Sequence, residues 1–359
     1  MNNSSSPVLQ DRWFEKNPAP VVILLVISII NNLILTVGVM AKKSLRTPTY
    51  FLVANLAISD ILLAATFINT AITRSTAVRD QISLGTRIAL CKFSNFAMNL
   101  SVVQSMQTLV IISFERYLAI LKPTKKLTSK RALTLSLISW LLATVISFPF
   151  LILSNIFKNR CHSTFSGTTA NIVINFLLVL AEFCFPFTAM GILYGIVLYH
   201  FHIKRSILAN NSSKSRRAKR KTTYMLLTTT GAFVICMLPW GLTLYIEATT
   251  NLSSLDLLND KRYPVRNLII GIGPVAYSIS VFYNPIIYCI FNRKIRQLYF
   301  PCNCSFGNVF VAANITDSNT PKVPVEATST EVIHRHLSNK YRITPINVLR
   351  PVNHLSVHD

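Results

Sequence analysis

The stretch LVISIINNLILTV (residues 25–37) carries no charged residue and no alternation of polar and apolar positions, and LTLSLISWLLATVISF (residues 133–148) has the same character. Strands of a membrane barrel alternate over about ten residues, so both stretches predict helices. A helix needs about 20 mostly apolar residues to cross a bilayer. We therefore expect an all-α membrane protein, a bundle of seven transmembrane helices over residues 19–40, 48–72, 88–117, 132–153, 171–200, 222–248 and 268–290.

The composition of the 359-residue chain agrees with a membrane protein. Hydrophobic residues make up 51% and charged residues only 14%, whereas roughly a quarter of a soluble domain is charged. The formal net charge of +23 is unevenly placed: one side of the predicted membrane has 19 Lys and Arg in 52 residues, and the other has 10 in 68. An excess of Lys and Arg marks the cytoplasmic side. We therefore expect an extracellular amino terminus, a cytoplasmic carboxyl terminus and no nucleic-acid partner.

The predicted spans divide the chain into four parts. Residues 1–18 form an extracellular tail, and residues 19–290 form the transmembrane domain. The stretch FNRKIRQLYF (residues 291–300) is basic and amphipathic, which predicts a short eighth helix on the inner membrane surface. Residues 301–359 are polar and lack a long apolar run, so we expect a disordered cytoplasmic tail.

Several side chains outside the spans are candidates for modification. Asn2, Asn3 and Asn251 each begin an Asn-x-Ser sequon on the predicted outer side, where glycosylation occurs. Cys302 and Cys304 directly follow the amphipathic stretch, a position that suits lipidated thiols. The sequence therefore predicts a glycosylated and lipidated protein.

Polar residues inside the predicted spans identify candidate functional positions, because lipid penalises them unless they face the bundle interior. Asp60 lies in the second span, among apolar neighbours. Ser101 and Ser105 of the third span are four residues apart, as are Ser280 and Asn284 of the seventh, so each pair shares a helix face. These oxygens predict either a cation or water site, with Asp60 as the metal ligand, or a polar network that holds no ion.

Cys91 opens the third span and Cys161 lies in the loop before the fifth, both on the predicted outer side. An extracellular setting permits a disulfide between them. Such a bond would tether the loop over the mouth of the bundle.

Motifs in consecutive spans resemble those of the rhodopsin-like (class A) G-protein-coupled receptors, over roughly residues 19–304. They occur in order and on the sides of the membrane that hydropathy assigns. They are LRTPTYFLVANLAISD before and in the second span, Cys91, Glu115-Arg116-Tyr117, Trp140, Pro186 with Tyr194, Pro239, and NPIIY from Asn284 to Tyr288.

The resemblance implies roles for these residues. Arg116 would contact a G protein or its own bundle according to state, and Tyr194 and Tyr288 would swing inward on activation. Asp60 with the four polar residues of the third and seventh spans would form a pocket for an allosteric sodium ion, and no other cofactor is expected. Cys91 and Cys161 would form the shared outer disulfide. The implied activation switch comprises Glu115, Arg116, Tyr117, Tyr194, Phe233, Pro239, Asn284, Pro285 and Tyr288.

The chain departs from the family pattern at three points that matter here. Asn31 replaces the usual Gly of the first span. Met237 occupies the position of the customary Trp before Pro239, so the usual aromatic toggle is in question. Lys219 stands where many relatives place an acid that pairs with the third-span Arg. Because Lys cannot attract Arg116, we expect measurable signalling without ligand.

The outer halves of the spans limit the ligand class. Amine receptors carry an Asp where this chain has Met98, and opsins carry a Lys where it has Ser278, so neither ligand is expected. Glu182 is an acid on the outer half of the fifth span, and it would either pair with a basic group of the ligand or hydrogen-bond between helices. The predicted ligand-binding residues are Met98, Asn99, Val102, Glu182, Met237, Trp240, Leu244, Tyr277 and Ser278.

The sequence thus predicts a plasma-membrane receptor that converts binding of an extracellular ligand into activation of heterotrimeric G proteins. A peptide is the favoured ligand, and a small molecule such as a nucleoside or indole derivative is the alternative. Arrestin, receptor kinases and membrane lipids are further expected partners. The chain lacks HExxH, GxSxG and P-loop motifs, so no enzyme is predicted. A transporter or channel is a remote alternative, because internal repeats and a filter loop are not visible.

Overall fold

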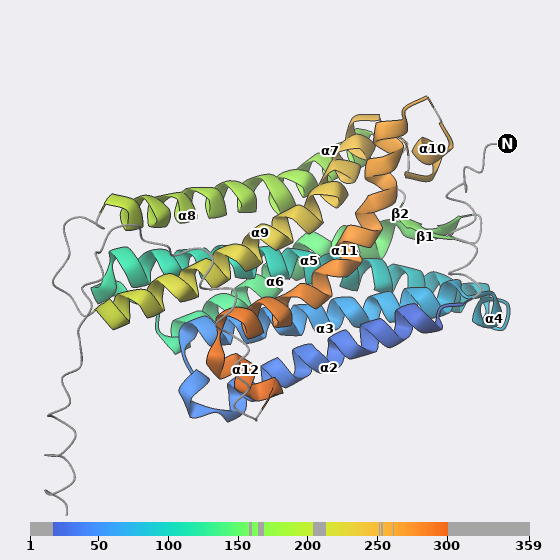
Figure 1. Cartoon of the computed structure of the whole chain (residues 1–359). Helices are drawn as coiled ribbons and strands as arrows, with labels where there is room; N and C mark the ends of the chain where they lie inside the picture. The colour runs from blue at the N-terminus through green and yellow to red at the C-terminus, as the bar shows by residue number, and fades with distance from the viewer. Residues whose placement is uncertain are drawn as a thin grey trace, which may run out of the picture. The chain divides into compact units, whose positions relative to one another are not determined.

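The computed structural model of the chain describes residues 17–157, 160–163, 169–203, 213–250, 252, 254–260 and 262–300. The predicted modification sites Asn2, Asn3, Asn251, Cys302 and Cys304 lie outside this part, as does the carboxyl tail from residue 301. Long helices lie side by side in one bundle (Figure 1). They are α2 (Ala19–Ala41), α3 (Pro48–Arg74), α5 (Leu84–Leu121), α6 (Ser129–Leu153), α7 (Thr169–Val179) continued by η3 (Leu180–Cys184) and α8 (Phe185–Ile203), α9 (Ser213–Thr250) and α11 (Pro264–Phe291).

Shorter elements lie between the long helices or follow the last of them. They are η1 (Lys43–Leu45), α4 (Thr76–Arg79), η2 (Pro123–Lys125), α10 (Ser254–Asn259) and α12 (Arg293–Tyr299). Strands β1 (Ser154–Phe157) and β2 (Arg160–Ser163) form an antiparallel hairpin, with Ser154 opposite Ser163. We call the end of the bundle that carries β1 and β2 the hairpin end, and the opposite end the α12 end (Figure 1).

The predicted number of spans agrees with the described part of the structure. Six helices are long and apolar enough to cross a membrane, and the two halves of α11, bent by 42° near residue 274, make a seventh. Helix α5 has 38 residues, about 57 Å at 1.5 Å per residue, and so exceeds a hydrocarbon core of ~30 Å. It begins four residues before the predicted span because the Ser83 hydroxyl accepts the Thr86 N–H and caps it.

The distribution of apolar side chains shows that the bundle uses lipid as its solvent. On α6, Leu133, Leu137, Leu141 and Val145 recur every fourth residue, and all four are exposed. The opposite face buries small and polar residues, namely Ser136, Ser139, Ala143 and Ser147. A soluble helix would show the reverse pattern, because water drives large apolar side chains inward. This face of α6 is therefore suited to contact with lipid tails.

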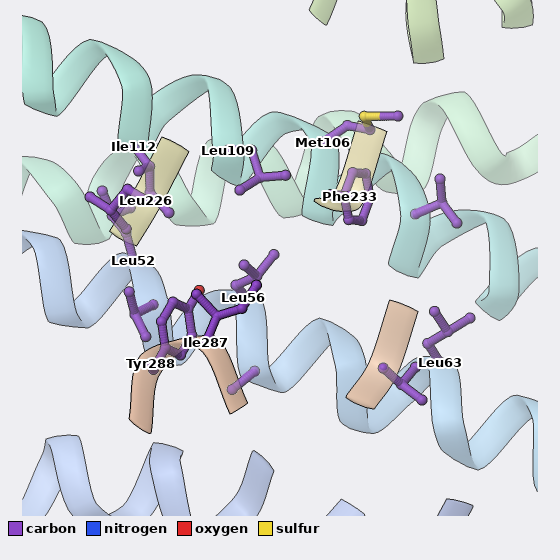
Figure 2. Close-up of a cluster of buried hydrophobic side chains, with 14 of the residues drawn as sticks. Leu52, Leu56, Leu63, Met106, Leu109, Ile112, Leu226, Phe233, Ile287 and Tyr288 are labelled. Atoms are coloured by element: carbon purple, nitrogen blue, oxygen red, sulfur yellow. The ribbon is translucent and has the colours of Figure 1, made fainter. Parts of the chain in front are cut away.

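Large apolar side chains from α3, α5, α9 and α11 fill part of the bundle interior (Figure 2). Buried leucines of α3 meet Met106, Leu109 and Ile112 of α5. Helix α9 adds Leu226 and Phe233, and α11 adds Tyr288. This core links four helices, so a shift of one helix must repack the others.

The fifth span contains a turn of π-helix at η3, where the backbone N–H of Phe185 bonds the carbonyl of Leu180, five residues earlier. Pro186 explains this turn, because proline has no N–H and its ring clashes with the carbonyl four residues before it, here that of Glu182. The extra residue in the turn buries both Glu182 and Phe183. Phe183 then packs so closely on Gly241 of α9 that a Cβ there would lie 3.0 Å from its ring.

The hairpin is the main feature that the all-α prediction missed. Each strand has only four residues, which is too short for an alternating pattern to be recognised in the sequence. Cys161 of β2 forms a disulfide with Cys91 of α5, as predicted. The Asn95 amide of α5 donates to the Ser154 hydroxyl of β1, 3.0 Å away, and gives the hairpin a second attachment.

Removing the disulfide is expected to lower stability without changing the helices. The two cysteines are 70 residues apart, and closing a loop of this length contributes about 2–4 kcal/mol. We expect Cys91→Ala and Cys161→Ala to unfold at a lower temperature by similar amounts, and the double variant to lose no more than either. A double variant much less stable than the singles would contradict the pairing. Thermal unfolding of detergent-solubilised protein measures these differences.

Candidate functional site

The centre of the bundle holds a buried carboxylate–amide pair. The Asn284 amide of α11 donates to Asp60 of α3 at 2.7 Å, and both residues are at most 2% exposed. The Oδ1 atom of Asn284 is buried without a hydrogen-bond partner among the described residues. Ser101 and Ser280 donate to carbonyls of their own helices, those of Ala97 and Tyr277. The hydroxyl lone pairs therefore stay free to accept.

This set of oxygens fits a small hard cation. A carboxylate, an amide oxygen without a partner and serine hydroxyls are the ligand types that such ions take. Ser105 is buried on the same helix as Ser101, so the predicted residues line the interior of three helices. Groups of three or more His, Cys, Asp or Glu side chains are absent from the described residues, so any metal here would depend on Asp60 and neutral oxygens.

Two residues of α2 hold α11 in place beside this pair. Pro285 cannot donate to the carbonyl four residues before it, that of Val281. The Ser28 hydroxyl donates to this carbonyl at 2.7 Å, and the Asn32 amide donates at 3.1 Å. A polar contact between helices thus replaces the backbone bond that Pro285 removes. Sequence analysis did not identify Ser28, and the serine in LVISIINN gave no signal that it faces α11.

A second polar cluster lies toward the α12 end. Arg116 donates to both carboxylate oxygens of its neighbour Glu115, each at 2.5 Å, and to the Thr49 hydroxyl of α3 at 2.5 Å. Arg116 is only 8% exposed and Glu115 6%. Successive helix residues point about 100° apart, so sequence alone left this pairing open. Thr49 was also missed, although it belongs to the quoted stretch LRTPTY.

The remaining predicted switch residues are buried or partly buried. Tyr194 and Tyr288 are buried, and the Tyr194 hydroxyl lies 3.4 Å from that of Thr230 on α9. Phe233 and Met237 of α9 are also buried. Tyr117 faces partly outward, with its ring 5.7 Å from the Lys122 ammonium. The side chain of Lys219 lies outside the described residues.

A third polar cluster occupies the half of the bundle toward the hairpin end. The Asn99 amide of α5 donates to Glu182 at 2.9 Å, and the Ser147 hydroxyl of α6 donates to the Asn99 oxygen at 2.8 Å. Glu182 is 0% exposed, and its second oxygen has no hydrogen-bond partner in the part of the chain that the structure describes. The bond to Asn99 agrees with a hydrogen bond between helices, and the oxygen that has no partner among the described residues agrees with pairing to a basic group of the ligand.

Aromatic side chains belong to the same region. Trp240 stacks on Tyr277, with ring centroids 5.8 Å apart, and the Tyr277 hydroxyl donates to the Met98 carbonyl at 2.9 Å. Val102, Met237 and Leu244 are buried as well. Ser278 differs, because its hydroxyl donates to the Val275 carbonyl of its own helix. The structure therefore brings most of the predicted ligand-binding residues to buried positions on α5, η3, α9 and α11.

An ion cluster orders the connection between α9 and α11. Arg262 lies 2.9 Å from Asp260, and Arg266 lies 3.8 Å from it. Hydrogen bonds from Arg262 lower the pKa of Asp260 to about 2, so this carboxylate stays ionised at physiological pH. Arg266 also donates to the Leu257 carbonyl of α10 at 2.9 Å. These contacts attach α10 to the start of α11.

Fold and site together define a seven-helix membrane protein with polar clusters at its centre and toward both ends. Residues 31–288 match the family described as 7 transmembrane receptor (rhodopsin family), and the chain belongs to this family. The predicted fold class and the resemblance are thereby confirmed. Membrane-spanning helices and the family indicate a multi-pass protein of the plasma membrane, and receptors of this family are not enzymes.

Relatives with peptide-receptor names share moderate identity with the chain. The neuromedin-K receptor of Mus musculus is 28% identical over 283 residues, which cover 76% of this chain and 60% of the relative. The tachykinin-like peptides receptor 86C of Drosophila melanogaster is 28% identical over 305 residues, covering 79% and 58%. The RYamide receptor of the same fly is 26% identical over 351 residues, covering 90% and 72%. The chain spans about 60% of the length of the first of these relatives.

Proposed function

We propose that the protein is a cell-surface receptor that binds an extracellular peptide and activates a heterotrimeric G protein. The observation that carries the proposal is the buried Arg116 cluster at one end of a bundle whose opposite end is covered by a tethered hairpin. The names of the relatives support a peptide rather than a nucleoside or an indole derivative. The disulfide and the distribution of Lys and Arg support an extracellular hairpin end and a cytoplasmic α12 end.

The proposed mechanism is a shift between two arrangements of the same helices. In the arrangement described, Arg116 is bonded to Glu115 and Thr49, and the hydroxyl of Tyr194 faces Thr230. Exposing Arg116 to a G protein requires breaking its bonds to Thr49 and Glu115. A peptide can drive that change only by its higher affinity for the active arrangement. Coupling would run through the shared core of α3, α5, α9 and α11.

The ligand site in this proposal is the hairpin-end cluster of Asn99, Glu182, Trp240 and Tyr277. Glu182 supplies a carboxylate whose second oxygen has no hydrogen-bond partner within the described part of the chain. The stacked aromatic rings supply faces that attract cations. This chemistry suits a peptide with a basic side chain. Met98, Val102, Met237, Leu244 and Ser278 complete the proposed site.

The pocket around Asp60 is proposed to hold a sodium ion that stabilises the inactive arrangement. Sodium chloride is then expected to weaken agonist binding to the wild type about fivefold relative to N-methylglucamine chloride, at the lower end of typical allosteric coupling. Asp60→Ala should abolish this difference, because it removes the charged ligand. Ser59→Ala, at a buried neighbouring position on α3, should keep it. An equal salt effect in wild type and Asp60→Ala would refute the pocket.

Nucleotide exchange tests the proposed function directly. We expect receptor in lipid nanodiscs to accelerate exchange on at least one purified heterotrimeric G protein when peptides with basic residues are added. Arg116→Gln should retain peptide binding and lose exchange, since it removes the charge that the cluster holds. If the receptor binds peptide but accelerates exchange on none of the G proteins, the proposed G-protein activation is wrong and only peptide binding stands. Measured substrate uptake or ion flux would favour the transporter or channel instead.

The parts of the chain beyond the described residues carry further proposals. Glycans on Asn2, Asn3 and Asn251 would place their segments outside the cell. Lipids on Cys302 and Cys304 would hold the end of α12 at the inner leaflet, where its basic residues also suit anionic lipid headgroups. Phosphorylation of the Ser and Thr residues of the tail by receptor kinases would create a site for arrestin.

A further inference from the structure

The Ser147 hydroxyl of α6 bonds to another helix, unlike the hydroxyls of two other α6 residues. Ser139 and Thr144 donate to backbone carbonyls three and four residues earlier, which is the usual local bond of a hydroxyl inside a helix. Ser147 donates instead to the side-chain oxygen of Asn99 on α5, 2.8 Å away. Because Ser147 is fully buried, this donor is held in place between the two helices.

The Asn99 side chain connects this bond to Glu182. An amide group accepts at its oxygen and donates at its nitrogen, so a donor at the Asn99 oxygen favours the orientation in which the nitrogen faces the other way. That nitrogen donates to Oε1 of Glu182 at 2.9 Å. If the amide were reversed, its oxygen would face the carboxylate, and two acceptors repel. The Ser147 bond therefore supports the orientation that stabilises a charged Glu182.

The three side chains form a chain of hydrogen bonds with one direction. It begins at Ser147 on α6, passes through Asn99 on α5 and ends at Glu182 in η3, and all three residues are at most 4% exposed. Consecutive hydrogen bonds polarise and strengthen one another in a buried setting. The chain occupies one carboxylate oxygen, and the other has no partner among the described residues. It thus fixes the carboxylate and leaves one oxygen for a ligand group.

We propose that Ser147 is a positioning residue that sets the preference of the receptor for a basic ligand group. Acting through Asn99, it holds the Glu182 carboxylate charged and in one orientation. The inference rests on the proposed function in taking Glu182 as the anchor of that basic group. Ser147 does not itself contact the ligand. Without its hydroxyl, the buried Asn99 oxygen would lose this donor, and the amide would no longer be held toward Glu182.

Thermal unfolding of the full-length receptor in lipid nanodiscs, without G protein, tests the role of Ser147. The probes are cationic N-acetylargininamide and neutral N-acetylcitrullinamide, which has nearly the same shape. At about 20 mM probe and a dissociation constant of about 1 mM, the cationic probe should raise the unfolding midpoint of the wild type by about 3 °C more than the neutral one. Glu182→Gln should abolish this difference. Ser147→Ala should weaken binding of the cationic probe about fivefold and so halve the difference.

Two further variants separate positioning from a merely structural role. Ser147→Thr keeps the hydroxyl and should keep the difference between the probes. Ser139→Ala removes another hydroxyl from the buried face of α6, one that accepts from Gln104 at 3.0 Å. It should lower the midpoint of the unliganded receptor and keep the difference between the probes. If Ser147→Ala does not fold, Ser147→Cys, which donates only weakly, should show the loss instead.

Failure of this inference and failure of the proposed function give different results. The role of Ser147 is refuted if the wild type does not discriminate the probes, or if Ser147→Ala keeps the full difference. It is also refuted if Ser139→Ala or Ser147→Thr loses as much as Ser147→Ala. Discrimination that depends on Ser147, in a receptor that activates no G protein, would refute G-protein activation alone. Discrimination that depends on Glu182 but not on Ser147 would refute the positioning role alone.

Discussion

Replacing Glu182 with Gln is expected to lower the potency of a cationic peptide agonist at least about tenfold, or ~1.4 kcal/mol. The carboxylate is fully buried and accepts one hydrogen bond from Asn99, and its second oxygen has no partner among the residues that the structure describes. Glutamine keeps the shape and can still accept from Asn99, but it has no charge for a basic group. The variant therefore separates ion pairing from interhelical hydrogen bonding. Dose–response curves of nucleotide exchange measure the change.

Two controls make this result specific. Glu247→Gln alters another acid toward the hairpin end of α9, where the carboxylate accepts from the backbone and hydroxyl of Ser254, and it should leave potency within about twofold. A peptide analogue with its basic residues made neutral should lose the difference between wild type and Glu182→Gln. Unchanged potency of the cationic agonist would assign Glu182 to the interhelical network alone.

Replacing Lys219 with Glu is expected to lower signalling without ligand about fivefold. In the described residues, Arg116 is bonded to Glu115 on its own helix and to Thr49 on α3, and these contacts do not tie it to α9. An acid at position 219 would form an ion pair between α9 and Arg116 and so stabilise the inactive arrangement. A partly exposed ion pair contributes about 1 kcal/mol, which is close to a fivefold population shift. Basal nucleotide exchange at matched receptor density measures it.

The neighbouring lysine provides a control for charge alone. Lys221→Glu makes the same change of charge two residues away on α9, where the helix turn points it about 200° from position 219. Its basal signalling should remain close to that of the wild type. Equal basal signalling in wild type and Lys219→Glu would show that position 219 does not oppose Arg116. A fall of the same size in Lys221→Glu would indicate a general effect of charge on the membrane surface.

Sequence patterns predicted the membrane spans and their buried polar residues, because hydropathy and helical spacing depend only on neighbouring residues. Apolar runs long enough for a bilayer predicted all seven spans to within a few residues of the helices, apart from the extensions of α5 and α9 beyond them. Asp60 and Asn284 could be proposed together because a buried charge or amide must find a polar partner inside the bundle. Their direct bond agrees with that reasoning. The disulfide of Cys91 with Cys161 agrees with the pairing that the resemblance to the receptor family implies.

Sequence patterns could not predict which side chains on different helices form hydrogen bonds with one another. Thr49 beside Arg116, Ser147 beside Asn99 and Ser28 beside the Val281 carbonyl all join residues at least 48 positions apart. Many other serines and threonines in the spans have the same kind of sequence surroundings, so the sequence does not single these three out. Only the rotation and tilt of each helix decide which hydroxyl reaches which partner, and packing of the whole bundle sets both.

Hydropathy and helical spacing act over a few turns, so the sequence was enough to predict a bundle of membrane helices with charged and amide groups buried inside it. The packing of the helices was needed to show that Glu182 turns inward to Asn99 and that Thr49 holds Arg116. Those arrangements depend on how helices far apart in the chain pack together, and local propensity does not encode that geometry.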